Sequence, residues 1–229
     1  MISGTKVGKA DLHLLYVADP LCSWCYGFSP VISALAEQFA DRLPMKLLMG
    51  GLRAGNTRPM RASDKDYIRD AWHRVGAATG REFDLAFFER ENFVYDTEPV
   101  CRAVVTAREW SSSSPLSPLA LMDRLSTAFY AHNRDVTDHE ILADIAAEAG
   151  FDRAEFSARL LSPEMRNATF RDFLTVQQMG ISGFPMLAAG TEARGYALVT
   201  HGYRPLEGLP EAIETWLASG APVEPGTEH

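Results

Sequence analysis

The chain has 229 residues, of which 46% are hydrophobic and 23% charged, and its formal net charge is −8. These values fit a globular protein with one large domain, or a domain that carries an insertion. The negative charge argues against nucleic-acid or acidic-membrane partners, which require clustered Lys and Arg. No run approaches the roughly 20 apolar residues that span a bilayer, and the N-terminal pattern is not that of a signal peptide. We therefore expect a cytoplasmic protein with no nucleic-acid or membrane partner.

The first fifty residues predict a strand, a helix and a second strand. The short apolar run from Leu12 to Ala18 is too brief for a helix and predicts a buried strand. A helical pattern extends from Ser29 onward, and Pro30 suits its first turn. A second apolar run, Met45 to Met49, ends at a pair of glycines. This order is a βαβ unit, which belongs to a sheet with a parallel strand pair.

The middle of the chain, residues 63–161, has the start and stop signals of helices but no convincing strand. Gly80 is an expected helix stop, and Thr137 with Glu140 is expected to form a capping box at the start of a later helix. The pattern therefore predicts an all-helical insertion.

The remainder of the chain returns to mixed elements. The sequence predicts a helix from Ser162-Pro163 to about Met179, a hairpin of Met186 to Ala189 and Ala197 to Thr200, and a last helix from about Pro205 to Ala218. Without the insertion, the order βαβ then αββα is that of a thioredoxin domain. We predict an α/β, thioredoxin-like fold formed by residues 1–62 and 162–229, with a helical insertion domain at 63–161.

A Cys-x-x-Cys run, Cys22-Ser23-Trp24-Cys25, follows the first strand and opens the helix. Its two sulfurs lie one helical turn apart, close enough to form a disulfide. The unpaired N–H groups and the dipole of a helix start favour a thiolate at Cys22. We predict that Cys22 is the nucleophile, and that Cys25, one turn inside, is shielded and resolves the mixed disulfide.

The cysteine pair has two other interpretations, half of a zinc site and a pair of inert core residues. Zinc requires two more ligands, and neither Cys101 nor any of the six histidines falls in a paired ligand spacing. We therefore predict no metal site.

Cys101 itself is expected to be a small buried hydrophobe, with a third redox centre as the alternative. Asp19 either tunes the thiols as a proton acceptor or stabilises the Asp-Pro turn.

The run Ser182-Gly183-Phe184-Pro185 precedes the predicted hairpin. A proline that opens a strand cannot donate to the ladder, and an X–Pro bond is the common route to a cis peptide. A thioredoxin fold places its cis-proline here, beside the dithiol. We expect Phe184 and Pro185 to bind substrate, with the Phe184 backbone pairing to it like an added strand. Trp24 is also well placed to contact substrate.

Three stretches resemble the DsbA family and, within it, the FrnE-like branch of predicted disulfide isomerases. They are DPLCSWCYGF at 19–28, EPVCRA at 98–103 and GISGFP at 180–185. The resemblance implies a thioredoxin fold with a redox dithiol at Cys22 and Cys25 and a cis-proline at Pro185. It also implies protein or small-molecule disulfides and thiols as substrates and no bound cofactor, and it leaves glutathione open as a redox partner.

Two related groups differ from this chain at the cysteine pair. The dipeptide Ser23-Trp24 lacks the histidine of the periplasmic oxidant, so extreme oxidising power is not expected. Chromene-carboxylate isomerases and kappa glutathione transferases have a serine at the position of Cys22, which argues against their chemistry. We predict a thiol–disulfide oxidoreductase or disulfide isomerase. The alternatives are a glutathione-dependent isomerase or transferase, and a non-enzymatic binding module that docks through its helical insertion.

Overall fold

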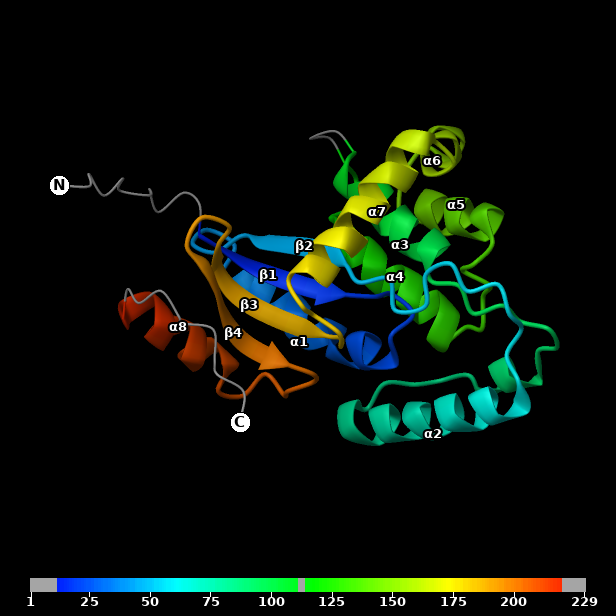
Figure 1. Cartoon of the computed structure of the whole chain (residues 1–229), viewed down its shortest axis with the longest axis horizontal. Helices are drawn as coiled ribbons and strands as arrows, with labels where there is room; N and C mark the ends of the chain where they lie inside the picture. Colours follow the sequence, from blue (N-terminus) through cyan, green and yellow to red (C-terminus); the bar gives the residue numbers. More distant parts are fainter. Residues whose placement is uncertain (1–11, 111–113, 220–229) are drawn as a thin grey trace.

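The computed structural model describes residues 12–110 and 114–219, so the outer parts of the predicted ranges 1–62 and 162–229 lie outside the described residues. Its sheet lies beside a group of helices (Figure 1). The elements in chain order are β1 (His13–Ala18), α1 (Ser23–Gln38), β2 (Met45–Met49), α2 (Ala62–Thr79), the short 3-10 helix η2 (Leu85–Glu89), α3 (Glu98–Arg108), α4 (Pro118–Tyr130), α5 (His139–Glu148), α6 (Arg153–Leu160), α7 (Pro163–Gln178), β3 (Met186–Thr191), β4 (Gly195–His201) and α8 (Leu209–Ser219).

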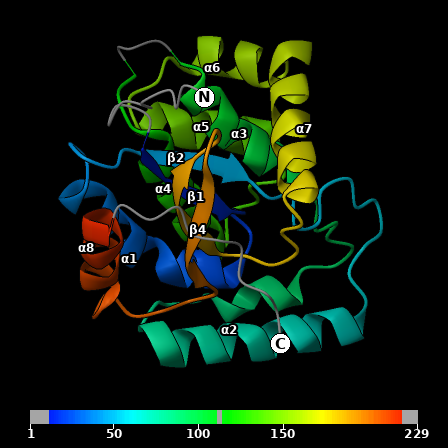
Figure 2. The ribbon, with the colours of Figure 1, turned by 60° about the vertical axis from the view of Figure 1, so that its left-hand side comes forward.

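The four strands form one mixed sheet in the order β2-β1-β3-β4. Strand β1 is parallel to β2 and antiparallel to β3, and β3 and β4 form the antiparallel hairpin. Alternate side chains of β1 face opposite sides of the sheet. Leu14 and Tyr16 belong to the core cluster that α1 and α8 also enter, whereas Leu15 and Val17 pack with Val176 of α7. Figure 2 shows α1 and α8 on one side of the sheet and α7 on the other. The predicted thioredoxin-like architecture is confirmed.

Helix α1 begins at Ser23, so Pro30 is an interior residue. The prediction that Pro30 occupies the first turn is therefore wrong. A proline inside a helix has no N–H to give to the carbonyl four residues earlier, which here is Tyr26 O. The Ser29 hydroxyl donates a hydrogen bond to that carbonyl at 3.1 Å. This bond replaces the missing one, which explains how the helix continues through the proline.

Two other helix starts differ from the prediction. Asp138 rather than Thr137 caps α5, and its carboxylate accepts a hydrogen bond from Glu140 N at 2.7 Å. The Thr137 hydroxyl instead donates to Asp135 at 2.6 Å. Helix α8 begins at Leu209 and not near residue 205, because Gly208 has a left-handed backbone with a φ of +78° that ends any helical run before it.

The larger of the two hydrophobic clusters continues from the sheet into the helices of the 63–161 segment. The ring of Tyr26 in α1 stacks on Tyr130 in α4, with 4.8 Å between centroids. Trp72 of α2 meets Tyr130 edge to face at 5.1 Å. The face of α1 that carries Tyr26 is therefore covered by the helical segment. The domain boundaries at 63 and 161 stay a prediction.

Candidate active site

Cys22 is the N-cap residue of α1 and has extended backbone angles, φ −92° and ψ 114°. Its side chain makes no cap hydrogen bond, so the sulfur is not bound to a first-turn amide of the helix. The sulfur lies 3.5 Å from Phe184 O, in a loop far along the sequence. The residue is 7% exposed. Cys22 therefore combines a small exposed fraction with the positive end of a helix, where a thiolate is favoured.

Cys25 lies one turn further into α1 and is 0% exposed. Burial raises the pKa of its thiol well above the usual value, and the neighbouring Cys22 raises the pKa further. Both residues are thiols in this structure. Cys25 is thus shielded, as predicted. Its thiolate requires an interaction that counters the cost of burying the charge.

The Phe184–Pro185 loop lies across the dithiol. The peptide bond between these residues is cis, as the sequence predicted. Pro185 O accepts a hydrogen bond from Gly202 N at 2.8 Å, which fixes the loop to the end of β4. A Cβ placed on Gly50 would lie 2.1 Å from the tip of the Phe184 ring, so only glycine leaves room for that ring. The fold therefore brings Cys22, Phe184 and Pro185 together from opposite ends of the chain.

Trp24 lies on another side of the site. Its half-buried ring packs against Tyr203, which follows β4, with 5.9 Å between centroids. Tyr203 therefore supports the Trp24 ring at the start of α1.

Asp19 is completely buried below the cysteine loop. Its carboxylate accepts hydrogen bonds from Leu21 N at 2.8 Å and Leu52 N at 2.7 Å, and the Cys101 thiol lies 3.5 Å from it. Burial raises the pKa of Asp19, while these hydrogen bonds and that of Thr97 oppose the rise. One carboxylate therefore holds the cysteine loop, the segment after β2 and α3 together.

Sequence reasoning missed two tyrosines of the site. Tyr95, just before α3, donates a hydrogen bond to Leu21 O at 2.9 Å and so holds the residue that precedes Cys22. Tyr16 in β1 is buried next to Cys25. Neither belongs to a motif, and the sequence signalled only that Tyr16 lies in an apolar strand. Cys101 is a buried thiol whose pKa is raised first by burial and then by the Asp19 charge.

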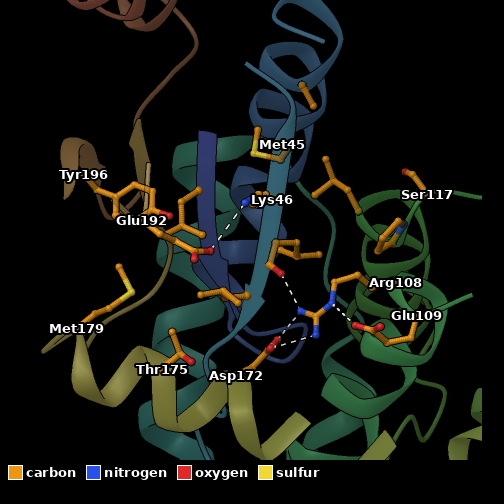
Figure 3. Close-up of a pocket in the computed structure, with 16 residues that line it drawn as sticks. Met45, Lys46, Arg108, Glu109, Ser117, Asp172, Thr175, Met179, Glu192 and Tyr196 are labelled. Carbon is orange, nitrogen blue, oxygen red and sulfur yellow. Dashed lines mark hydrogen bonds and ion pairs between the residues drawn. The ribbon is translucent and has the colours of Figure 1, made fainter. Parts of the chain in front are cut away.

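A cavity of about 570 Å³ follows the outer edge of β2, away from the dithiol (Figure 3). On its wall, Arg108 of α3 pairs with Asp172 of α7 at 2.6 Å and donates to Leu47 O at 2.9 Å. Asp172 in turn accepts a hydrogen bond from Met49 N at 3.0 Å. None of the predicted site residues lines this cavity.

Metal and membrane features were sought in the part of the chain that the structure describes. Within residues 12–110 and 114–219, no three or more His, Cys, Asp and Glu side chains are grouped so that they could hold a metal ion. None of the helices there is both long and apolar enough to cross a bilayer.

The geometry above agrees with what comparison with known proteins shows. The model of the family described as "DSBA-like thioredoxin domain" matches residues 14–214. The chain belongs to this family. Within it, a solved structure from Nitrosomonas europaea, described as a candidate protein disulfide isomerase, is 34% identical to this chain. The two superpose with a TM-score of 0.84, over 92% of this chain and 100% of the other.

Two further relatives are more distant. The cytosolic disulfide reductase DsbM of Pseudomonas aeruginosa shares the fold, with 24% identity and a TM-score of 0.72 over 90% of this chain and 99% of its own. The ClpXP adapter protein SpxH of Bacillus subtilis (strain 168) is 22% identical over 183 residues, or 78% of this chain. The match spans only 58% of the length of SpxH.

Proposed function

We propose that this protein is a thiol–disulfide oxidoreductase in which Cys22 attacks and Cys25 resolves. The observation that carries the proposal is the position of Cys22 at the N-cap of α1, with its sulfur 3.5 Å from Phe184 O. A substrate disulfide that reaches this sulfur also lies next to the backbone of Phe184.

The reaction proceeds in two exchanges. The Cys22 thiolate attacks one sulfur of a substrate disulfide, the substrate S–S bond breaks, and the other substrate sulfur leaves with the electron pair. Cys25 then attacks Cys22, which forms the Cys22–Cys25 disulfide and releases the second substrate thiol. The substrate is reduced and the enzyme dithiol oxidised, and the reverse sequence transfers a disulfide to substrate.

The shape of the site supports protein or small-molecule disulfides as substrates. Phe184 O is a backbone acceptor next to the attacking sulfur, which suits an extended peptide that pairs as an added strand. Trp24 and the Phe184 ring supply apolar contact on two sides. DsbM has been solved with GSH, and its name places it in the cytosol. We accordingly propose cytoplasmic action, no bound cofactor, and glutathione as a redox partner.

A non-catalytic adapter is the second candidate, because the curated relative is named an adapter. An adapter requires a docking surface and does not require two cysteines around one helix turn. A glutathione-dependent isomerase stays the third candidate. The related isomerases have a serine at the position of Cys22, so this chemistry does not require the cysteine pair. Replacing each cysteine therefore separates the oxidoreductase from the other two functions.

The test is a trapping experiment with insulin and with a glutathione–peptide mixed disulfide. We expect Cys22→Ser to reduce turnover to background, and Cys25→Ser to accumulate a covalent adduct that dithiothreitol releases. Cys101→Ala is the matched control and should keep turnover near that of the wild type. Absence of turnover in the wild type would favour the adapter, and full turnover in both Cys22→Ser and Cys25→Ser without an adduct would contradict the oxidoreductase and favour the glutathione-dependent isomerase.

A further inference from the structure

The Tyr16 hydroxyl is a buried polar group that the structure leaves unsatisfied. Tyr16 stands in the middle of β1 and is 1% exposed. Its hydroxyl oxygen has no hydrogen-bond partner among the described residues. Buried hydroxyls in native proteins nearly always have one, so an exception calls for a physical explanation.

The groups that act on this hydroxyl are the two thiols and Asp123. Burial raises the pKa of Tyr16 well above its usual value, and the charges of Cys25 and then Cys22, the side chain of Cys25 and the charge of Asp123 raise it further. The Tyr16 ring is held edge to face against Phe28, with 6.3 Å between centroids. Phe28 follows Cys25 by three residues in α1, and Tyr16 and Cys25 belong to the same buried cluster, so the hydroxyl lies on the Cys25 side of the core.

Cys25 is a poor hydrogen-bond acceptor for the Tyr16 hydroxyl in this structure. Cys25 is a thiol here, and a neutral thiol is a poor hydrogen-bond acceptor. A thiolate accepts hydrogen bonds strongly, because bonds to charged groups are shorter and stronger than neutral ones. The unsatisfied hydroxyl thus gains a strong acceptor when Cys25 loses its proton.

We propose that the Tyr16 hydroxyl donates a hydrogen bond to the Cys25 thiolate and so positions and stabilises the resolving nucleophile. The inference rests on the proposed function. During resolution the Cys25 thiolate attacks Cys22, the bond from Cys22 to the substrate sulfur breaks, and that sulfur leaves with the electron pair. It takes up, through solvent, the proton that Cys25 released. Tyr16 keeps its own proton throughout, so it is a positioning residue and not an acid or a base.

The decisive variant is Tyr16→Phe, which removes one oxygen atom. The titration of Cys25 is followed by thiolate absorbance in a Cys22→Ser, Cys101→Ala background. We expect the apparent pKa of Cys25 to rise by about one unit, a tenfold smaller thiolate fraction at a given pH. Resolution of a preformed mixed disulfide should slow roughly three- to fourfold, because a more basic thiolate is also intrinsically more nucleophilic. Its pH profile should move to higher pH.

Two controls keep the proposal falsifiable. Tyr26→Phe removes a neighbouring hydroxyl that already donates to Glu82 O at 3.2 Å, and it should leave the Cys25 titration unchanged. Tyr16→Phe should unfold at the wild-type temperature or above it, since the lost hydroxyl had no partner. A lower unfolding temperature with an unchanged Cys25 titration would overturn the proposal and assign the hydroxyl to the fold. The titration requires no turnover, so it can fail while the trapping experiment above succeeds.

Discussion

The outer edge of β2 and the dithiol end of β1 differ in whether their buried polar groups have hydrogen-bond partners. Along β2, Arg108 and Asp172 bind each other and also the backbone groups of Leu47 and Met49. At the dithiol end, Tyr16 has no partner for its hydroxyl, and burial raises the pKa values of Asp19 and Cys25. The first region is hollow but its buried ion pair is fully hydrogen-bonded, whereas the second leaves the Tyr16 hydroxyl without a partner.

This difference shows that cavity volume is a poor guide to chemistry in this molecule. The cavity beside β2 is lined by groups that already have partners, so it offers little to a reacting ligand. The dithiol end contains Asp19 and Cys25, whose pKa values are raised, and shifted pKa values are typical of functional sites. Each prediction below tests one side of that contrast.

The largest effect on stability is expected from Asp172→Ala. The change leaves the Arg108 side chain, only 25% exposed, without its carboxylate and leaves Met49 N–H without an acceptor. We expect the free energy of unfolding, measured with urea, to fall by about 2–4 kcal/mol. Glu214→Ala breaks the exposed pair with Arg42 and should cause no measurable change. Equal effects of the two variants would mean that the pair on β2 is only a surface contact.

The next largest effect concerns the order of alkylation. Iodoacetamide near neutral pH should modify Cys22 on the order of a hundredfold faster than Cys101, because a fully buried thiol reacts only after local opening. Cys25 should also lag behind Cys22. Peptide mass spectrometry at timed quenches gives the three rates. Modification of Cys101 first would reopen its interpretation as a third redox centre.

A smaller effect is expected from Gly50→Ala, which places a methyl group where the Phe184 ring now lies. The overlap should cost about 1–3 kcal/mol of unfolding free energy and shift the Phe184 loop, whose carbonyl lies 3.5 Å from the Cys22 sulfur. Turnover of insulin should fall together with stability. In the double variant with Phe184→Ala the stability loss should disappear, and if it persists the overlap is not its cause.

The smallest effect is a pH dependence carried by Asp19. Because burial raises the pKa of Asp19 in the folded state, the folded protein binds its proton more tightly than the unfolded chain does. This contribution to stability is complete below the ordinary pKa of aspartate and is lost as pH rises through the raised value. The difference in unfolding free energy between the wild type and Asp19→Asn should therefore shift against the wild type as pH rises. A difference that is constant with pH would contradict the raised pKa.

The sequence predicted what local patterns encode. The bounds of β2, Met45–Met49, were predicted correctly, and Ser162 caps α7 as expected. The position of Pro30 was misjudged because a proline signals a first turn, and the compensating bond from Ser29 is visible only in three dimensions. Neither η2 nor α6 was predicted.

The site was predictable only in part, for the same reason. The cysteine pair is a local motif, whereas the approach of Phe184 to Cys22 was expected only from the fold and the family resemblance. The Tyr16 hydroxyl and the bond from Tyr95 to Leu21 O depend on tertiary packing between elements far apart in the chain. No pattern in the sequence marks either tyrosine.

The aromatic stack between Tyr26 and Tyr130 has a consequence for engineering this fold. The boundary at residue 63 divides the sequence, yet the rings of α1, α2 and α4 interlock across it. A shortened chain without the helical segment would expose the face of α1 that carries Tyr26. Exchanging that segment between relatives therefore changes the packing against α1, the helix that carries both cysteines. New substrate preferences should be sought at Trp24 and the Phe184 loop instead.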